Sequence, residues 1–255
     1  KCMMDYRDFL ARPEMLLPVL NPQKIEQWRE KFRDQLEFTE CLTARMLTDF
    51  GIVMVESKII ASKAELLDLS SLFQYPLVLK TAEPGIKHKS ESDGVILNIE
   101  NETALLASYE RLSSELGPRA LVAPMQTDSG VEMILGIAND ADFGPMVIVG
   151  IGGIYTESLN DIVVVRPPFD AEYVFHCLDK LKTRKILDGV RGKSAVDIRA
   201  YCQAAAIVSV IALVFKDEIE ELDINPMLLK TQGCVGLDAL LIKNAAGQVS
   251  ENKIQ

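Results

Sequence analysis

The chain alternates between short apolar stretches with the two-residue period of strands and longer stretches whose apolar residues recur every three to four positions, as in helices. The expected strands, mostly bounded by Gly, Asp or Pro, are 53–55, 75–80, 94–99, 119–125, 130–137, 145–153, 161–165, 219–228 and 233–242. The expected helices are 24–36, 39–51, 102–116, 171–182 and 195–215. Because strands and helices are interleaved, the pattern predicts an α/β or α+β fold.

The composition is that of a folded protein. The 255 residues, 48% hydrophobic and 25% charged, suffice for one large domain or two small lobes around a shared cleft. The formal charge of −10 disfavours a nucleic-acid partner, since such binders normally carry a basic patch. The longest apolar run, Ala204–Phe215, is too short for a membrane span and predicts a buried helix, and no signal peptide is expected. Five scattered cysteines without a C-x-x-C pair fit reduced thiols and a cytoplasmic location.

The stretch EELDINPMLL places Asp223 and Asn225 two positions apart on an expected strand. Residues two apart on a strand point to the same face, so the pair offers several oxygens side by side, as Mg²⁺ prefers. The alternative is that Asn225 and Pro226 start a turn. If this strand and the next form a hairpin around Gln232 and Gly233, Asp238 lies across from Asn225 and completes an oxygen site.

Lys80 ends an apolar strand, where its ammonium is a compact charge suited to phosphates. The segment Ala82–Val95 that follows has two glycines, two lysines, a histidine and two serines, which is typical of a loop that covers an anion. His88 within it is open to phosphate acceptance or to a mere lid role. The stretch Gly150–Asp161 is a second glycine-rich turn, which favours close approach to a ligand over a plain hairpin turn. His176, on a helix, is interpreted as a packing residue.

These pieces, in this order, resemble the ATP-grasp domain of the NDP-forming acyl-CoA synthetases, the group related to the β subunit of succinyl-CoA synthetase. The resemblance runs from about Phe38 to Lys243 and rests on PLVLK, KHKSESDGV, GVEMILGIANDADFGPMVIVGIGG, LDGVRG and ELDINPMLL…GLDALL. It implies a two-lobed α+β ATP-grasp fold with ATP or ADP between the lobes. The implied division is 1–36 for a linker and outer helix, 37–125 for a lobe with the phosphate lid, 126–244 for a lobe with the metal site, and 245–255 for a tail.

The resemblance also implies roles for individual residues. The positions implied to contact nucleotide are Lys80, Lys89, Val122, Met125, Glu132, Gly152 and Gly153, with an adenine hinge over 122–125. Asn225 and Asp238, with help from Asp223, would hold Mg²⁺, and His88 would be a second phosphate carrier. The implied reaction is acyl-CoA + ADP + phosphate ⇌ acid + CoA + ATP, through an acyl phosphate and a phosphohistidine. The implied partner, in a hetero-oligomer, is a CoA-binding α-type subunit or domain that carries the main phosphohistidine.

The chain departs from the family pattern at three places. Asp93 stands where the family usually has the first of two glycines, Ala123 stands at a hinge position that is commonly Gln or Glu, and Val165 holds the place of an arginine that follows one residue later as Arg166. These departures keep open an alternative function, in which the chain is a non-catalytic module that senses nucleotide or acts as a scaffold in a larger protein. A stand-alone ligase that joins an acid to an amine is disfavoured, because the motifs match the CoA branch.

Overall fold

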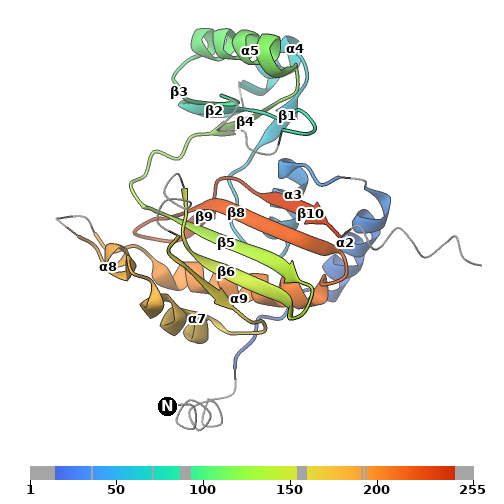
Figure 1. The fold of residues 1–255 in the computed structure, drawn as a ribbon. Coiled ribbons are helices and arrows are strands. Elements are labelled where there is room, and N and C mark those ends of the chain that lie inside the picture. The colour runs from blue at the N-terminus through green and yellow to red at the C-terminus, as the bar shows by residue number, and fades with distance from the viewer. Residues whose placement is uncertain are drawn as a thin grey trace, which may run out of the picture.

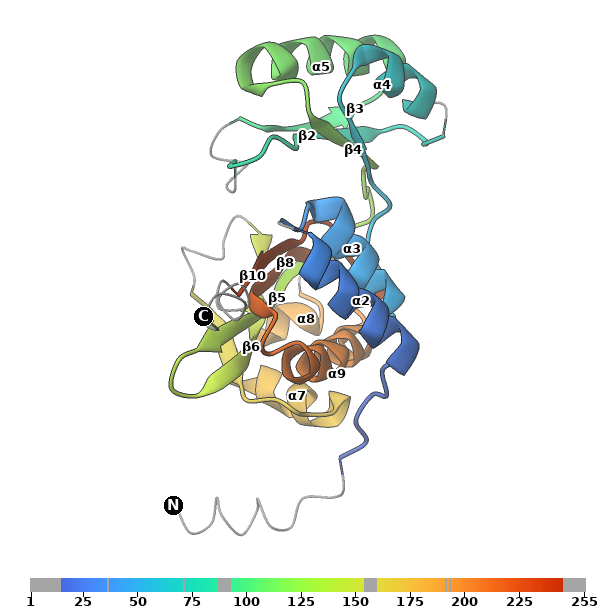
Figure 2. The same ribbon diagram turned by 90° about the vertical axis from the view of Figure 1, so that its right-hand side faces the viewer.

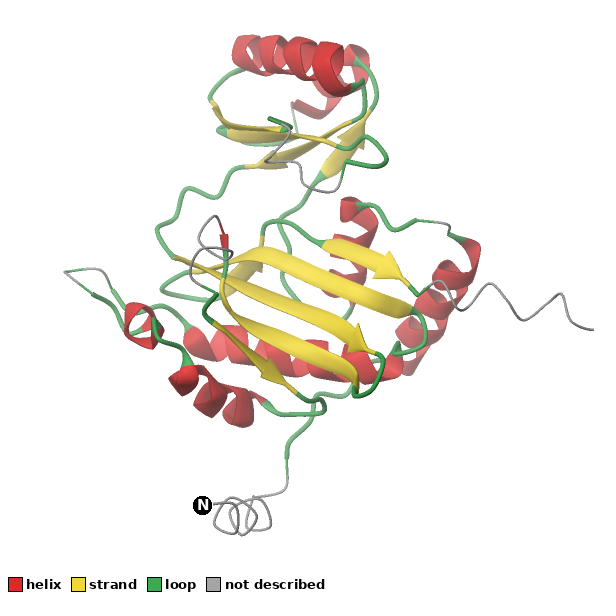
Figure 3. Cartoon of the chain, in the orientation of Figure 1, coloured by secondary structure: helices red, strands yellow, loops and turns green. Residues whose placement is uncertain are grey.

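The computed structural model describes residues 15–35, 37–70, 72–86, 93–153, 160–190, 192 and 194–244. They form two lobes, each built on an antiparallel sheet with its own hydrophobic core (Figures 1 and 3). The expected two-lobed α+β architecture is confirmed.

The small lobe is a four-stranded sheet in the order β1-β4-β2-β3, with helices α4 and α5 on one face (Figure 1). Its elements are β1 (Lys58–Ile60), α4 (Lys63–Ser70), β2 (Leu77–Thr81), β3 (Val95–Ile99), α5 (Glu102–Leu116) and β4 (Ala120–Pro124). Helix α5 begins where Asn101 accepts a hydrogen bond from the backbone of Ala104, and it ends at Gly117. All five residues of β2 are buried, so the lobe is organised around the strand that carries Lys80.

The large lobe is a six-stranded sheet in the order β10-β8-β5-β6-β7, with β9 also paired to β8. Its strands are β5 (Val131–Asp140), β6 (Gly144–Ile151), β7 (Ile162–Val165), β8 (Ile219–Leu229), β9 (Cys234–Gly236) and β10 (Leu240–Lys243). Its later helices are α7 (Ala171–Cys177), the 3₁₀ turn η2 (Leu178–Lys180), α8 (Arg184–Leu187) and α9 (Ile198–Val214).

Helix α9 crosses one face of the large sheet and forms the centre of its core (Figure 1). It begins at Asp197, whose side chain accepts the backbone N–H of Ala200. Ten of its residues are buried, which confirms the buried helix predicted from the apolar run. Among the described residues, no helix is long and apolar enough to cross a membrane.

The first two described helices, α2 (Pro22–Asp34) and α3 (Glu40–Asp49), pack on the large lobe (Figure 2). Trp28 and Phe32 are both buried, and Phe32 stacks on Phe38 with ring centroids 4.5 Å apart. The expected lobe boundary at residue 37 therefore differs from the packing, because α3 buries its apolar face in the large core and the small sheet begins only at Lys58.

The segment between α3 and β1 does not form the strand that the sequence predicted. Of the predicted strand 53–55, only Met54 forms a bridge, in parallel with Gly236. Val53 is 61% exposed, because the segment leaves the large core to reach the small lobe. The chain thus crosses between the lobes beside β9, close to the hairpin that carries Asp238.

Candidate functional site

Strand β8 presents its polar pair on the face of the large sheet opposite the helices. Leu222 and Ile224 are buried in the core, whereas Asp223 and Asn225 alternate with them and are half-buried on the other face. The alternation is that of a strand with one covered face. The predicted side-by-side arrangement of Asp223 and Asn225 is confirmed.

Asp238 reaches this pair through the hairpin of β8 and β9. Met227 of β8 pairs with Gly236 of β9, and Asp223 of β8 pairs with Leu240 of β10. The two pairings have the same register, so Asp238, which lies between β9 and β10, is opposite Asn225. The single expected strand 233–242 is broken at residues 237–239, where Leu237 donates its N–H to the Pro226 carbonyl at 2.9 Å. Asp238 sits in that break rather than inside a ladder.

The environment of Asp223 is acidic and poor in donors. Its Oδ1 atom is buried and has no hydrogen-bond partner among the described residues. Burial raises the pKa of Asp223 to about 6, repulsion from Glu221 and Asp238 adds to the rise, and a hydrogen bond from Asn225 opposes it. A buried carboxylate oxygen without a donor would be stabilised by a cation placed between it and Asp238.

Lys80 brings a positive charge from the small lobe to this acidic group. Its Nζ atom donates to Glu40 Oε1 at 2.9 Å, to the Leu237 carbonyl at 2.9 Å and to Asp238 Oδ2 at 3.0 Å. The side chain is only 10% exposed. Burial alone would lower the pKa of Lys80, but attraction by Asp238 and then Glu40 outweighs it, so the pKa is raised and the lysine is charged.

Glu132 and the second glycine turn adjoin Asn225. The Asn225 Oδ1 atom accepts the N–H of Gly153 at 2.9 Å, and the N–H of Gly152 binds the Glu132 carbonyl at 2.9 Å. Gly153 has a φ of +69°, and a Cβ atom there would overlap the Glu132 carboxylate. The glycines therefore let the backbone lie against Glu132 and Asn225.

The oxygens at this edge fit a hard divalent cation. Asp223 supplies an unpartnered carboxylate oxygen, Asp238 a second carboxylate, and Asn225 an amide oxygen on the same face. Mg²⁺ needs only one or two protein carboxylates when phosphates and water supply its other ligands. In the described part of the chain, no three His, Cys, Asp or Glu side chains are placed to hold a metal ion together.

The expected adenine hinge is only partly accessible. Val122 is fully buried in β4, with Lys58 of β1 on one side and Leu79 of β2 on the other. The neighbouring strands and the core enclose Val122, and its role at the hinge stays a prediction. Met125, just beyond the strand, is half-buried, and its N–H binds the Pro76 carbonyl at 2.9 Å.

The expected phosphate lid is described only at its ends. His88 and Lys89 lie outside the described residues. Asp93, which stands for a family glycine, is exposed and has a φ of +50°, a backbone region that favours glycine. Thr81 donates its N–H to the Gly94 carbonyl at 2.7 Å, so the described C-terminal end of this segment is bonded to the strand of Lys80.

The other departures lie away from the acidic edge. Ala123 is buried in the small lobe, and Val165 is buried in the large core, where an arginine would lack solvent. Arg166 is exposed. His176 is corrected from a packing residue to a surface residue, because its side chain is 66% exposed and lies 3.4 Å from Glu172.

Asp161, at the end of the second glycine turn, anchors the chain to α8. Its carboxylate accepts the backbone N–H groups of Lys182 and Thr183, both at 2.8 Å, and the Thr183 hydroxyl. Burial would raise the pKa of Asp161, but these hydrogen bonds outweigh it and hold the pKa below its usual value. The residue has a structural role.

Replacing Asp161 by asparagine is expected to lower the free energy of unfolding by about 2 kcal/mol at pH 7, because two N–H donors lose their carboxylate. A depressed pKa stabilises the fold above the unfolded-state pKa near 4, and this stabilisation is lost as the pH falls through the folded-state pKa. The difference from the parent should thus shrink below about pH 4. Urea unfolding from pH 3 to 8 tests this, with exposed Asp217→Asn as the control; a constant difference would contradict it.

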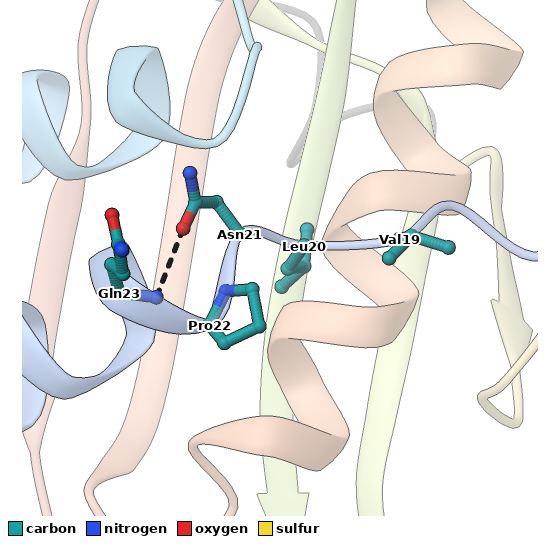
Figure 4. A pocket seen from close by; sticks show the side chains of 5 residues that line it. All are labelled: Val19, Leu20, Asn21, Pro22 and Gln23. Atoms are coloured by element: carbon teal, nitrogen blue, oxygen red, sulfur yellow. Dashed lines mark hydrogen bonds between the residues drawn. The ribbon is translucent and has the colours of Figure 1, made fainter.

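A surface hollow lies apart from all these groups. It is lined by residues 19–23, at the start of α2 (Figure 4). Asn21 caps that helix by accepting the N–H of Gln23 at 2.9 Å. None of the lining residues belongs to the acidic edge, so the hollow plays no part in the candidate site.

Sequence reasoning missed Glu40, the second carboxylate on Lys80. It lies in the first turn of an ordinary amphipathic helix, 40 residues before its partner. Its position at the start of a helix was the sole signal, and it does not point to Lys80.

Comparison with known proteins gives consistent matches. A family model described as an ATP-grasp domain matches residues 29–242. The chain is 31% identical, over 200 residues, to the β subunit of ADP-forming acetate–CoA ligase I from Pyrococcus furiosus, with 76% of this chain and 86% of that subunit covered. It is 30% identical to the ADP-forming 4-hydroxybutyrate–CoA ligase of Nitrosopumilus maritimus, with 76% of this chain covered but only 29% of that longer protein.

The solved structures that match this chain include structures of an acetyl-coenzyme A synthetase. Acetyl-coenzyme A synthetase 1 of Ca. Korarchaeum cryptofilum, in complex with coenzyme A and Ca-AMPCP, matches with a TM-score of 0.77 and 26% identity over 86% of this chain and 98% of that chain. A second structure of that enzyme, with coenzyme A and Mg-AMPPCP and a phosphohistidine segment that points towards the nucleotide-binding site, matches with a TM-score of 0.74 and 27% identity over the same shares.

Proposed function

We propose, from the premise that this chain belongs to the ATP-grasp family in the branch of the ADP-forming acid–CoA ligases, that it is the nucleotide-binding component of such a ligase. The reaction would be acyl-CoA + ADP + phosphate ⇌ acid + CoA + ATP. The observation that carries the proposal is the meeting of Lys80, from the small lobe, with the carboxylate of Asp238, from the large lobe, beside Asp223 and Asn225.

Each lobe would contribute one half of a phosphate site. Lys80 would donate to phosphate oxygens, since a charged lysine at the end of a rigid strand holds its ammonium at a fixed place. Asp223, Asn225 and Asp238 would hold Mg²⁺, which when bound would neutralise phosphate charge. Glu132, Gly152 and Gly153 would form the wall beside them, where the absence of a Cβ lets backbone approach the ligand.

The remaining roles belong to the lid and the partner. His88, on the segment between β2 and β3, would accept the phosphoryl group as a second carrier, with Lys89 beside it. A CoA-binding α-type partner would carry the main phosphohistidine and the acyl phosphate chemistry. Support comes from the relatives named as β subunits and from the related structure whose phosphohistidine segment points towards its nucleotide site.

Reconstitution with an α-type partner tests the proposal. The chain, the partner, Mg-ATP, CoA and a carboxylic acid such as acetate should yield acyl-CoA, ADP and phosphate in equal amounts. Release of AMP and pyrophosphate would contradict the proposal, because it would mean that the acid is activated as an adenylate.

A non-catalytic nucleotide-sensing module is the second candidate. The observation that favours it is Asp93, which stands where the family usually has a glycine and has a φ of +50° beside the expected phosphate lid. In that case Mg-ADP would bind to the chain, but no α-type partner would support acyl-CoA formation. Full turnover in the reconstituted mixture would exclude it.

A further inference from the structure

The ammonium of Lys80 is shared by two carboxylates that come from separate parts of the large lobe. Asp238 lies in the break between β9 and β10, and Glu40 lies in the first turn of α3. With the Leu237 carbonyl, they accept all three N–H groups of the ammonium. A phosphate can therefore gain a hydrogen bond from Lys80 only if one of these acceptors gives up its own.

The two carboxylates are not equivalent. Asp238 faces Asn225 and is 28% exposed, so it is open to a second cation. The Glu40 side chain is only 9% exposed and lies at a helix start, whose partial positive charge favours a carboxylate. Asp238 is thus the acceptor that can be exchanged, and Glu40 the one that stays.

We propose that Glu40 is the positioning residue of Lys80. Glu40 keeps the Lys80 ammonium at the cleft when the metal ion of a bound nucleotide competes with that ammonium for Asp238. This role rests on the proposed function. A divalent cation on Asp238 would draw on the charge of that carboxylate and weaken the hydrogen bond that its Oδ2 atom accepts from Lys80, so this N–H of Lys80 is the one most easily redirected. That N–H then turns to a phosphate oxygen, while Glu40 keeps the ammonium charged and in place.

Replacement of Glu40 by glutamine separates this role from a structural one. The amide can still accept a hydrogen bond, but Asp238 becomes the sole carboxylate partner of a buried ammonium, and the two are bound more tightly. The cation must then compete harder for Asp238, and the ammonium is held less well for phosphate. Adenosine has no phosphate, so its binding should not change.

The test uses the full chain with Glu40→Gln, and exposed Glu37→Gln as the matched control. Calorimetric titration should show Mg-ADP bound about tenfold more weakly by Glu40→Gln, the loss of about one charge-assisted hydrogen bond. The Mg²⁺ concentration for half-maximal ADP binding should rise severalfold, while adenosine affinity stays at the parent value. Glu37→Gln should match the parent in all three.

Several outcomes would overturn the proposal. One is unchanged ADP affinity in Glu40→Gln. Another is an equal loss of ADP and adenosine affinity in that variant, which would indicate a structural role. If Glu40→Gln does not fold, Glu40→Asp, which keeps the charge with a shorter reach, should retain a parent-like Mg²⁺ midpoint, and a severalfold rise would overturn the role. A folded parent that binds no Mg-ADP would overturn the proposed function and this role together, whereas binding by the parent with no effect at Glu40 overturns this role alone.

Discussion

Replacing Lys80 by methionine is expected to weaken Mg-ADP binding about 100-fold and to lower the free energy of unfolding by about 3 kcal/mol. Methionine keeps the length of the side chain but removes the charge. The nucleotide loses a charge-assisted contact, and Glu40 and Asp238 are left as two carboxylates without their shared cation. Calorimetry at a temperature where the variant is folded measures the first effect, and urea unfolding the second.

The two effects can be separated in a double variant. Lys80→Met with Glu40→Gln removes the ammonium together with one of its carboxylates, so most of the lost stability should return. The affinity for Mg-ADP should stay low, because no cation faces the phosphates. The exposed Lys58→Met serves as the control and should affect neither quantity. Recovery of nucleotide affinity in the double variant would contradict a direct contact between Lys80 and phosphate.

Replacing Gly152 by alanine is expected to lower the free energy of unfolding by about 3 kcal/mol. A Cβ atom at this position would overlap the Met133 carbonyl group and come within 2.7 Å of the Ile134 backbone nitrogen. Backbone atoms of the central strand β5 cannot rotate away as a side chain can, so the β5–β6 pairing must shift. The wall that holds Glu132 and Asn225 would shift with it, and Mg-ADP affinity should fall as well.

The control for Gly152 is Gly144, at the start of β6. Gly144 has a φ of +73°, and no atom lies within 4 Å of its missing Cβ. Gly144→Ala should therefore cost only the backbone strain, about 1 kcal/mol, and leave nucleotide affinity unchanged. Equal losses of stability in the two variants, measured by urea unfolding, would mean that the close contact at Gly152 is not what requires a glycine.

The acidic edge could be predicted from sequence because it depends on local rules. Strand alternation places Asp223 and Asn225 on one face, and a hairpin turn at Gln232 and Gly233 sets the register that brings Asp238 opposite Asn225. The buried helix α9 followed from an apolar run that has no polar face. Each inference needed only neighbours along the chain or across one tight turn.

Other features depend on contacts between distant segments. The pairing of Glu40 with Lys80, and the packing of α3 on the large lobe, follow from the way the chain crosses between the lobes, which periodicity does not encode. The apolar pattern of the sequence continues through residues 237–239, so these residues were expected to form part of a strand, whereas the structure has a break there. The burial of Val122 arises because β4 lies between two other strands of the small sheet.

The most direct measurement is calorimetric titration of Mg-ADP into the parent chain and into Asp238→Ala. The proposed site predicts saturable binding with one nucleotide per chain, and an affinity at least tenfold lower in Asp238→Ala. Omission of Mg²⁺ should weaken the parent more than the variant, because the variant has already lost a metal ligand. A folded parent that binds no Mg-ADP, or an Asp238→Ala variant that binds it as tightly as the parent, would contradict a nucleotide site at the meeting of Lys80 with Asp223, Asn225 and Asp238.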